Sequence, residues 1–269
     1  MTTITTTPSC ISKLLQSRLD MSEWEELLGM TSDVASILER ANVTYMMFAG
    51  TLLGSYRHHG IIPWDVDVDL TLDMRDQTAI ENAFRNVSKY ILVKYNPPTH
   101  WKVNFPTKKF PFVDLFFYRQ NGSYIVEPYG EFYQLKTDIY PLIRRPLNGL
   151  RLYAPRNTKE ILEKRYGRDL YWCRVHDYSC GVDCFELSSW CPIVFRNSSF
   201  TQLIRNGSIM VERERLQFKE SVLHILDIEI PNVGTEYESH LWSAIIRECL
   251  RENLVTNESV IEQWALINF

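Results

Sequence analysis

The sequence has no long apolar run, no excess of positive charge and no tandem repeat. Its mean hydropathy is −0.21, and no stretch reaches the roughly 20 apolar residues of a membrane-spanning helix. The net charge of −4 argues against a general nucleic-acid-binding surface. Residues 1–10 lack the charged start and apolar core of a signal peptide, so we expect none in this chain. The composition is that of a globular protein.

The 269 residues are enough for one large domain or for a domain with an annex. We expect a lead-in over residues 1–30, a core over residues 31–172, and a cysteine-containing loop followed by a mostly helical C-terminal region over residues 173–269. Apolar spacing and polar caps predict helices at Ser22–Met30 (with Ser22 as N-cap), Asp33–Ala41, Gln77–Ser88, Ile209–Ile228, Tyr237–Leu250 and Val260–Leu266. Alternation and apolar runs predict strands at Tyr45–Ala49, Asp65–Leu72, Tyr90–Tyr95, His100–Phe105 and Phe112–Tyr118.

One predicted strand carries three aspartates in alternation with apolar residues, namely Asp65, Asp67 and Asp69. Alternate residues of a strand point to one face, so the carboxylates project together while the apolar residues face a core. Like charges on one strand face repel, and a hard divalent cation such as Mg²⁺ removes that cost through oxygen ligands. The pattern therefore predicts a metal site, although an ordinary solvated strand face has the same alternation.

A small-residue turn bounded by Gly50 and Gly54 precedes the acidic strand, and Thr51 lies within it. Glycine at a strand-to-helix junction lets the backbone approach a phosphate, and the first N–H groups of a helix favour anions. Arg57 follows at once, and its guanidinium suits a bidentate phosphate contact. We expect these residues to hold phosphate oxygens.

Asp114 lies alone in the apolar run of Phe112–Tyr118. A carboxylate in such a run rarely lacks a partner. It is either a core aspartate paired with Lys or Arg, or a third carboxylate of the metal site from a neighbouring strand. His100 and Lys102 precede this strand, and we expect them to contact donor phosphates unless they are solvated.

Two segments, Gly50–His58 and Ile62–Asp69, resemble the signature of the LicD family, which includes bacterial phosphocholine transferases and an animal branch with fukutin-related protein. The resemblance covers about residues 34–167 and is nearest to that animal branch. It implies an α+β nucleotidyltransferase fold, with a mixed sheet flanked by helices. It also implies that Asp67, Asp69 and Asp114 are the catalytic carboxylates that bind Mg²⁺ or Mn²⁺, with Asp65 as an outer acidic position.

The implied activity is transfer of a phosphorylated alcohol from a CDP-linked donor to a glycan hydroxyl, with Asp114 as the proposed proton acceptor. Two alternatives stay open: a nucleotidyltransferase acting on another acceptor, and a non-catalytic nucleotide- or glycan-binding module of the same fold. The animal relatives imply a Golgi location, whereas the expected absence of a leader and anchor leaves a cytoplasmic location open.

Four soft ligands follow the matched region, at Cys173, His176, Cys180 and Cys184. Thiolates and imidazoles at such short intervals can hold a structural Zn²⁺, although the spacing is not that of a standard zinc finger. In an oxidising compartment the cysteines would instead pair as disulfides. Free buried cysteines are the third alternative.

Overall fold

The computed structural model describes residues 19–62, 65–128, 133–167, 197–206, 209–218 and 221–231. Two compact units divide these residues. One is built from Leu19–Ile62 and Val66–Arg165, and the other contains the strands that follow residue 196. The first unit carries all of the predicted acidic and phosphate-binding residues except Asp65.

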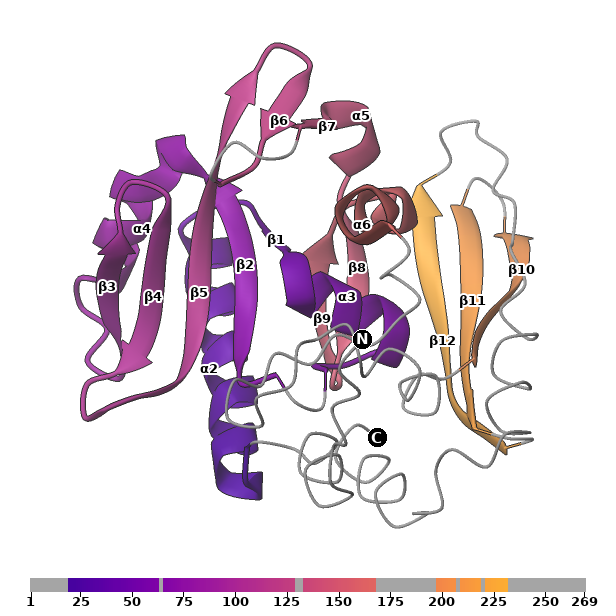
Figure 1. The fold of residues 1–269 in the computed structure, drawn as a ribbon, viewed down its shortest axis with the longest axis horizontal. Coiled ribbons are helices and arrows are strands. Elements are labelled where there is room, and N and C mark those ends of the chain that lie inside the picture. The colour runs from indigo at the N-terminus through magenta and orange to yellow at the C-terminus, as the bar shows by residue number, and fades with distance from the viewer. Residues whose placement is uncertain are drawn as a thin grey trace, which may run out of the picture. The chain divides into compact units, whose positions relative to one another are not determined.

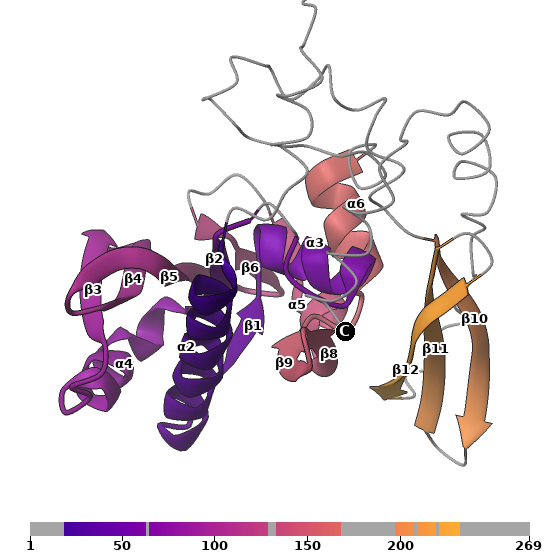
Figure 2. The ribbon, with the colours of Figure 1, turned by 90° about the horizontal axis from the view of Figure 1, so that it is seen from below.

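The first unit contains helices, a seven-stranded mixed sheet and a two-stranded ribbon (Figures 1 and 2). Its helices are α2 (Met21–Arg40), α3 (Ala49–His58), the 3₁₀-helix η1 (Met74–Asp76), α4 (Gln77–Phe84), α5 (Lys136–Ile139) and α6 (Thr158–Tyr166). Its strands are β1 (Tyr45–Met47), β2 (Asp67–Asp73), β3 (Ile91–Asn96), β4 (His100–Phe105), β5 (Lys108–Asn121), β6 (Tyr124–Val126), β7 (Tyr133–Leu135), β8 (Ile143–Leu147) and β9 (Leu150–Ala154). This arrangement confirms the predicted α+β class with a mixed sheet flanked by helices.

The sheet has the order β1-β2-β5-β4-β3, with β6 and β7 extending it from the end of β5. Strands β2 and β5 run parallel, whereas β1 pairs with β2 and β4 pairs with β5 in the antiparallel sense. Val68, Leu70 and Leu72 of β2 are fully buried, as their alternation with polar residues predicts. The apolar residues therefore anchor β2 in the core, and the aspartates between them must face the other way.

Helix α2 packs against β5, β2 and α4 through a buried stripe at helical spacing that includes Leu27, Met30, Val34 and Leu38. It is one continuous helix, so the prediction of two helices at Ser22–Met30 and Asp33–Ala41 is wrong. Thr31 is buried, and its hydroxyl donates to the Leu27 carbonyl, so the polar residues at the predicted break do not interrupt the helix. The N-cap is Asp20 rather than Ser22, and Asp20 forms a capping box with Glu23.

Two Asn-Gly pairs predict tight hairpin turns, and both turns are present. Strands β8 and β9 pair up to Leu147 and Leu150, and the two turn residues, Asn148 and Gly149, have φ values of 48° and 81°. The other Asn-Gly pair lies between β5 and β6. Helix α6 is followed by Gly167, whose φ of 53° is typical of the residue after a helix.

The second unit contains a three-stranded antiparallel sheet of β10 (Asn197–Asn206), β11 (Ile209–Phe218) and β12 (Ser221–Pro231). The predicted helix at Ile209–Ile228 is therefore wrong. Its apparent helical spacing came from a few aliphatic residues, whereas the alternation Ile228-Glu229-Ile230 is the pattern of a strand. The predicted helices at Tyr237–Leu250 and Val260–Leu266, and the residues Cys173, His176, Cys180 and Cys184, lie outside the described residues.

Among the described residues, no helix combines the length and the apolar character that a membrane crossing requires.

Candidate functional site

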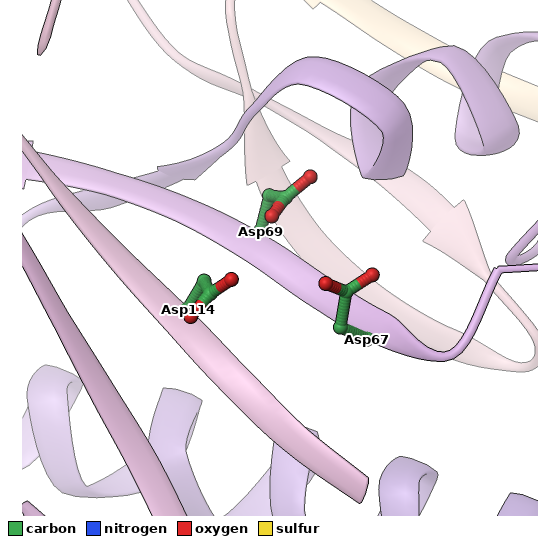
Figure 3. A group of neighbouring side chains, drawn as sticks. All are labelled: Asp67, Asp69 and Asp114. Carbon is green, nitrogen blue, oxygen red and sulfur yellow. The ribbon is translucent and has the colours of Figure 1, made fainter. Parts of the chain in front are cut away.

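Asp67, Asp69 and Asp114 lie together on one face of the sheet (Figure 3). Asp67 and Asp69 point to the same side of β2 because they are two residues apart. Asp69 lies directly opposite Asp114 in the parallel register of β2 and β5. One carboxylate oxygen from each residue lies within 4.8 Å of the other two. Asp65 precedes the start of β2 and does not belong to this cluster.

The three carboxylates are held close together in a partly buried position. Burial, and after it the negative charge of Asp114, raise the pKa of Asp67 to about 6. The positive charge of Lys102 and the nearby His100 act in the opposite direction. A bound cation would oppose both the burial and the repulsion from Asp114 that raise the pKa of Asp67.

Asp114 is buried and has two partners on the neighbouring strand β4. The His100 ring nitrogen Nε2 lies 2.8 Å from Asp114 Oδ1, and the Lys102 amino group lies 3.1 Å from the same oxygen. The Lys102 amino group is 3.4 Å from Asp114 Oδ2. Both interpretations of Asp114 from the sequence therefore describe it. It pairs with a lysine, and it also lies beside the other two carboxylates.

The donor set fits a hard divalent cation. Three carboxylates on two adjacent strands offer oxygen ligands, and Mg²⁺ is commonly held by one or two such groups together with substrate phosphates. Asp67 and Asp69 are half-buried, whereas Asp114 is buried and pairs with Lys102. The residues that would hold the ion are therefore Asp67, Asp69 and one oxygen of Asp114.

The first turn of α3 is tied to β2 at the acidic position. The Phe48 amide donates to the Asp69 carbonyl at 3.0 Å, and the Asp69 amide donates to Thr51 Oγ1 at 2.7 Å. Gly50 lies between these two contacts, in the first turn of α3. The N–H groups at the start of α3 are thereby placed beside Asp69, where a helix N-terminus favours an anion such as phosphate.

Gly54 and Arg57 lie beyond the first turn of α3, which is where the predicted phosphate contact would be made. Arg57 is seven residues after Gly50, about 10 Å along the helix, and it is buried. A Cβ atom added to Gly54 would lie 2.5 Å from the Gly60 carbonyl oxygen and 3.1 Å from the Ile62 amide nitrogen. Gly54 therefore allows the segment that leads toward β2 to pass directly over α3.

In the absence of metal, we expect the Asp67→Asn variant to be more stable than the parent at pH 7.5 by about 2–3 kcal/mol, since one pKa unit is worth about 1.4 kcal/mol. The pKa of Asp67 is higher in the folded state than its ordinary value of 3.8. The folded state therefore binds more protons than the unfolded state between pH 4 and pH 6, and the parent loses stability as the pH rises through that interval.

Urea unfolding in EDTA at pH 4 and pH 7.5 measures this difference. The two proteins should be close in stability at pH 4 and diverge at pH 7.5. The exposed Glu25→Gln variant is the control and should show no such divergence. Equal stabilities of parent and Asp67→Asn at both pH values would contradict the electrostatic account of the cluster.

Several polar residues close to the site carry no recognisable sequence signal. Thr71, Glu127, Gln134 and Arg165 line a pocket that begins beside the start of α3. They come from β2, the segment after β6, β7 and α6, and no spacing in the sequence marks them as a group. Only the folded arrangement brings them together.

Residues 42–157 match the model of the LicD/FKTN/FKRP nucleotidyltransferase domain. The chain is 30% identical to the ribitol 5-phosphate transferase FKRP of Mus musculus over 146 residues. This alignment covers 50% of this chain and 30% of that protein. A 35-residue stretch is 46% identical to the lipopolysaccharide cholinephosphotransferase LicD of Haemophilus influenzae, 13% of either chain. The matched part thus spans less than a third of either relative.

Among solved structures, the lincosamide antibiotic adenylyltransferase LnuA aligns with a TM-score of 0.36 at 11% identity, covering 53% of this chain and 85% of that one. The family match contains Gly50 and Thr51 of α3 and all three clustered carboxylates. Residues 42–157 therefore resemble the nucleotidyltransferase domain of the LicD/FKTN/FKRP family, and the rest of the chain lies outside that match.

Proposed function

We propose that this protein is a metal-dependent transferase that moves a phosphorylated alcohol, such as phosphocholine or ribitol phosphate, from a CDP-linked donor to a glycan hydroxyl. The observation that carries the proposal is the cluster of Asp67, Asp69 and Asp114, whose carboxylate oxygens lie within 4.8 Å of one another beside the start of α3. Carboxylates beside a helix N-terminus suit a metal ion together with a pyrophosphate.

The relatives support the class of group transferred. One is named as a ribitol 5-phosphate transferase and another as a cholinephosphotransferase, so both names describe movement of an alcohol linked to phosphate. The two names differ in the alcohol, and the family match alone does not choose between them.

Transfer of a phosphorylated alcohol requires positioning and charge neutralisation more than covalent help from the protein. Mg²⁺ or Mn²⁺, when bound, would neutralise charge on the donor pyrophosphate and on the CMP leaving group. The first turn of α3 would hold phosphate oxygens through its backbone N–H groups, with Thr51 fixing that turn against Asp69. Lys102 would add positive charge beside the phosphates from β4.

In the proposed reaction, the acceptor hydroxyl oxygen forms a bond to the phosphorus that carries the alcohol. The bond from that phosphorus to the bridging oxygen breaks, and CMP leaves with the electron pair. The hydroxyl proton passes to Asp114, whose Oδ2 is the freer oxygen because His100 and the closer Lys102 contact are both on Oδ1. His100 holds the Asp114 carboxylate in place for this step.

The test is CMP release from CDP-choline, CDP-ribitol and CDP-glycerol, each with Mg²⁺, with Mn²⁺ and with EDTA. We expect metal-dependent release from at least one donor, because the carboxylate cluster leaves the donor pyrophosphate unneutralised without a cation. A parallel assay of pyrophosphate release from CTP and ATP covers the nucleotidyltransferase alternative. Pyrophosphate release without CMP release would replace the proposed reaction with that alternative, and binding of nucleotide with no release would favour a non-catalytic module.

A further inference from the structure

Lys102 of β4 lies on the same face of the sheet as the carboxylate cluster. It is directly opposite Asp114 in the antiparallel register of β4 and β5, and Asp114 is opposite Asp69 in the next pair of strands. The Lys102 amino nitrogen lies 3.1 Å from Asp114 Oδ1 and 3.4 Å from Asp114 Oδ2. Its positive charge is therefore directed at both oxygens of one carboxylate of the candidate metal site.

Two aromatic rings hold the Lys102 amino group at this position. Its nitrogen lies 3.6 Å from the centre of the Phe112 ring and 4.9 Å from the centre of the Tyr95 ring. Phe112 is opposite Asp67 in the register of β2 and β5, so its ring belongs to the same face of the sheet. The Lys102 side chain is only 17% exposed, and cation–π attraction to the two rings offsets its lost hydration. The ammonium group is therefore built into the site and is not a solvated surface charge.

The charges of the cluster balance with a single divalent cation. Asp67, Asp69 and Asp114 carry three negative charges when they are ionised. The Lys102 ammonium group neutralises one of them, and one divalent cation neutralises the other two. A second cation bound through Asp114 would compete with Lys102 for the same two oxygens. In a partly buried site, like charges at such short range repel strongly, so the second cation would have to displace the lysine.

We propose that Lys102 takes the place of a second metal ion, so that the carboxylate cluster binds one divalent cation per chain and not two. The inference rests on the proposed function only for the presence of a divalent cation. Asp67 and Asp69, with one oxygen of Asp114, bind the ion, and Lys102 is the fixed counter-ion of the Asp114 carboxylate. The two aromatic rings keep the ammonium group in place when the ion binds.

Manganese binding, measured by electron paramagnetic resonance, tests the assignment without any turnover. Free Mn²⁺ gives a strong signal, so the loss of that signal on addition of protein gives the number of ions bound per chain. The double variant Asp67→Asn/Asp69→Asn sets the background from any site outside the cluster. Above this background, we expect one ion per chain for the parent and two for Lys102→Met, because methionine keeps the approximate length of the side chain without its charge. The two ions in Lys102→Met should also show the broadened signal of a magnetically coupled pair.

Two further variants separate the charge of Lys102 from its packing. Lys102→Arg keeps the positive charge and should bind one ion, like the parent. Lys94→Met on β3 is the matched control, because Lys94 pairs with Glu81 outside the cluster, and it should also bind one ion. Melting curves identify a variant that has lost its fold, and Lys102→Gln then carries the test in place of Lys102→Met.

The assignment is overturned if the parent binds two coupled ions in the cluster, or if a folded Lys102→Met variant still binds only one ion at saturating Mn²⁺. Failure of the proposed function gives a different result. One ion in the parent and two in Lys102→Met, without CMP release from any donor, would remove the proposed reaction and leave the role of Lys102 standing. Metal-dependent CMP release by a parent that binds two ions would do the reverse.

Discussion

Asp69→Asn is expected to lower metal-dependent CMP release about a thousandfold, because loss of one metal-binding carboxylate removes several kcal/mol of charge stabilisation from the transition state. Asp69 is one of the three clustered carboxylates and lies opposite Asp114 in the parallel register of β2 and β5. Asparagine keeps the size of the side chain and the backbone contact to Thr51, so the change removes charge with little effect on packing. Asp67→Asn should have a similar effect for the same reason.

The measurement is the initial rate of CMP release with the best donor over a range of Mg²⁺ and Mn²⁺ concentrations. Asp76→Asn is the matched control, since Asp76 lies at the end of η1 outside the cluster, and it should keep the parent rate. Melting curves should show that all three variants are folded. CMP release at nearly the parent rate by both Asp67→Asn and Asp69→Asn would contradict the proposed metal site.

Gly54→Ala is expected to destabilise the protein by about 2 kcal/mol or more, since an overpacked core commonly costs 1–3 kcal/mol and here the obstruction is backbone. The added methyl group would lie 2.5 Å from the Gly60 carbonyl oxygen, and neither α3 nor the following segment can yield without moving the entry to β2. Gly29→Ala in α2 is the control, because nothing lies within 4 Å of its added Cβ. That change should stabilise the protein by up to about 1 kcal/mol through helix propensity.

Urea unfolding of both variants separates a packing role from a phosphate-binding role at Gly54. A loss of stability in Gly54→Ala with a gain in Gly29→Ala supports close packing. Unchanged stability of Gly54→Ala with weaker binding of CDP would instead favour the phosphate contact that the sequence predicts.

The alternation of aspartate with valine and leucine in β2 determines by itself that Asp67 and Asp69 share a face, because the period of a strand is two. The Asn-Gly turns, the strand at His100–Phe105 and the end of α6 before Gly167 follow equally from local rules. Each of these features depends on residues that are close in the chain. Sequence reasoning failed at β11 and β12, where a few aliphatic residues happened to have helical spacing.

The tertiary structure decided everything that depends on pairing between distant segments. The parallel register of β2 and β5 sets Asp69 opposite Asp114, which lies 45 residues later in the chain. No local pattern specifies a register between strands more than 40 residues apart, since it depends on which apolar faces can be buried together. The pocket that contains Thr71 and Gln134 has the same origin. Short stretches of the chain thus indicate the type of chemistry, whereas carboxylates from separate strands meet only when the core is packed.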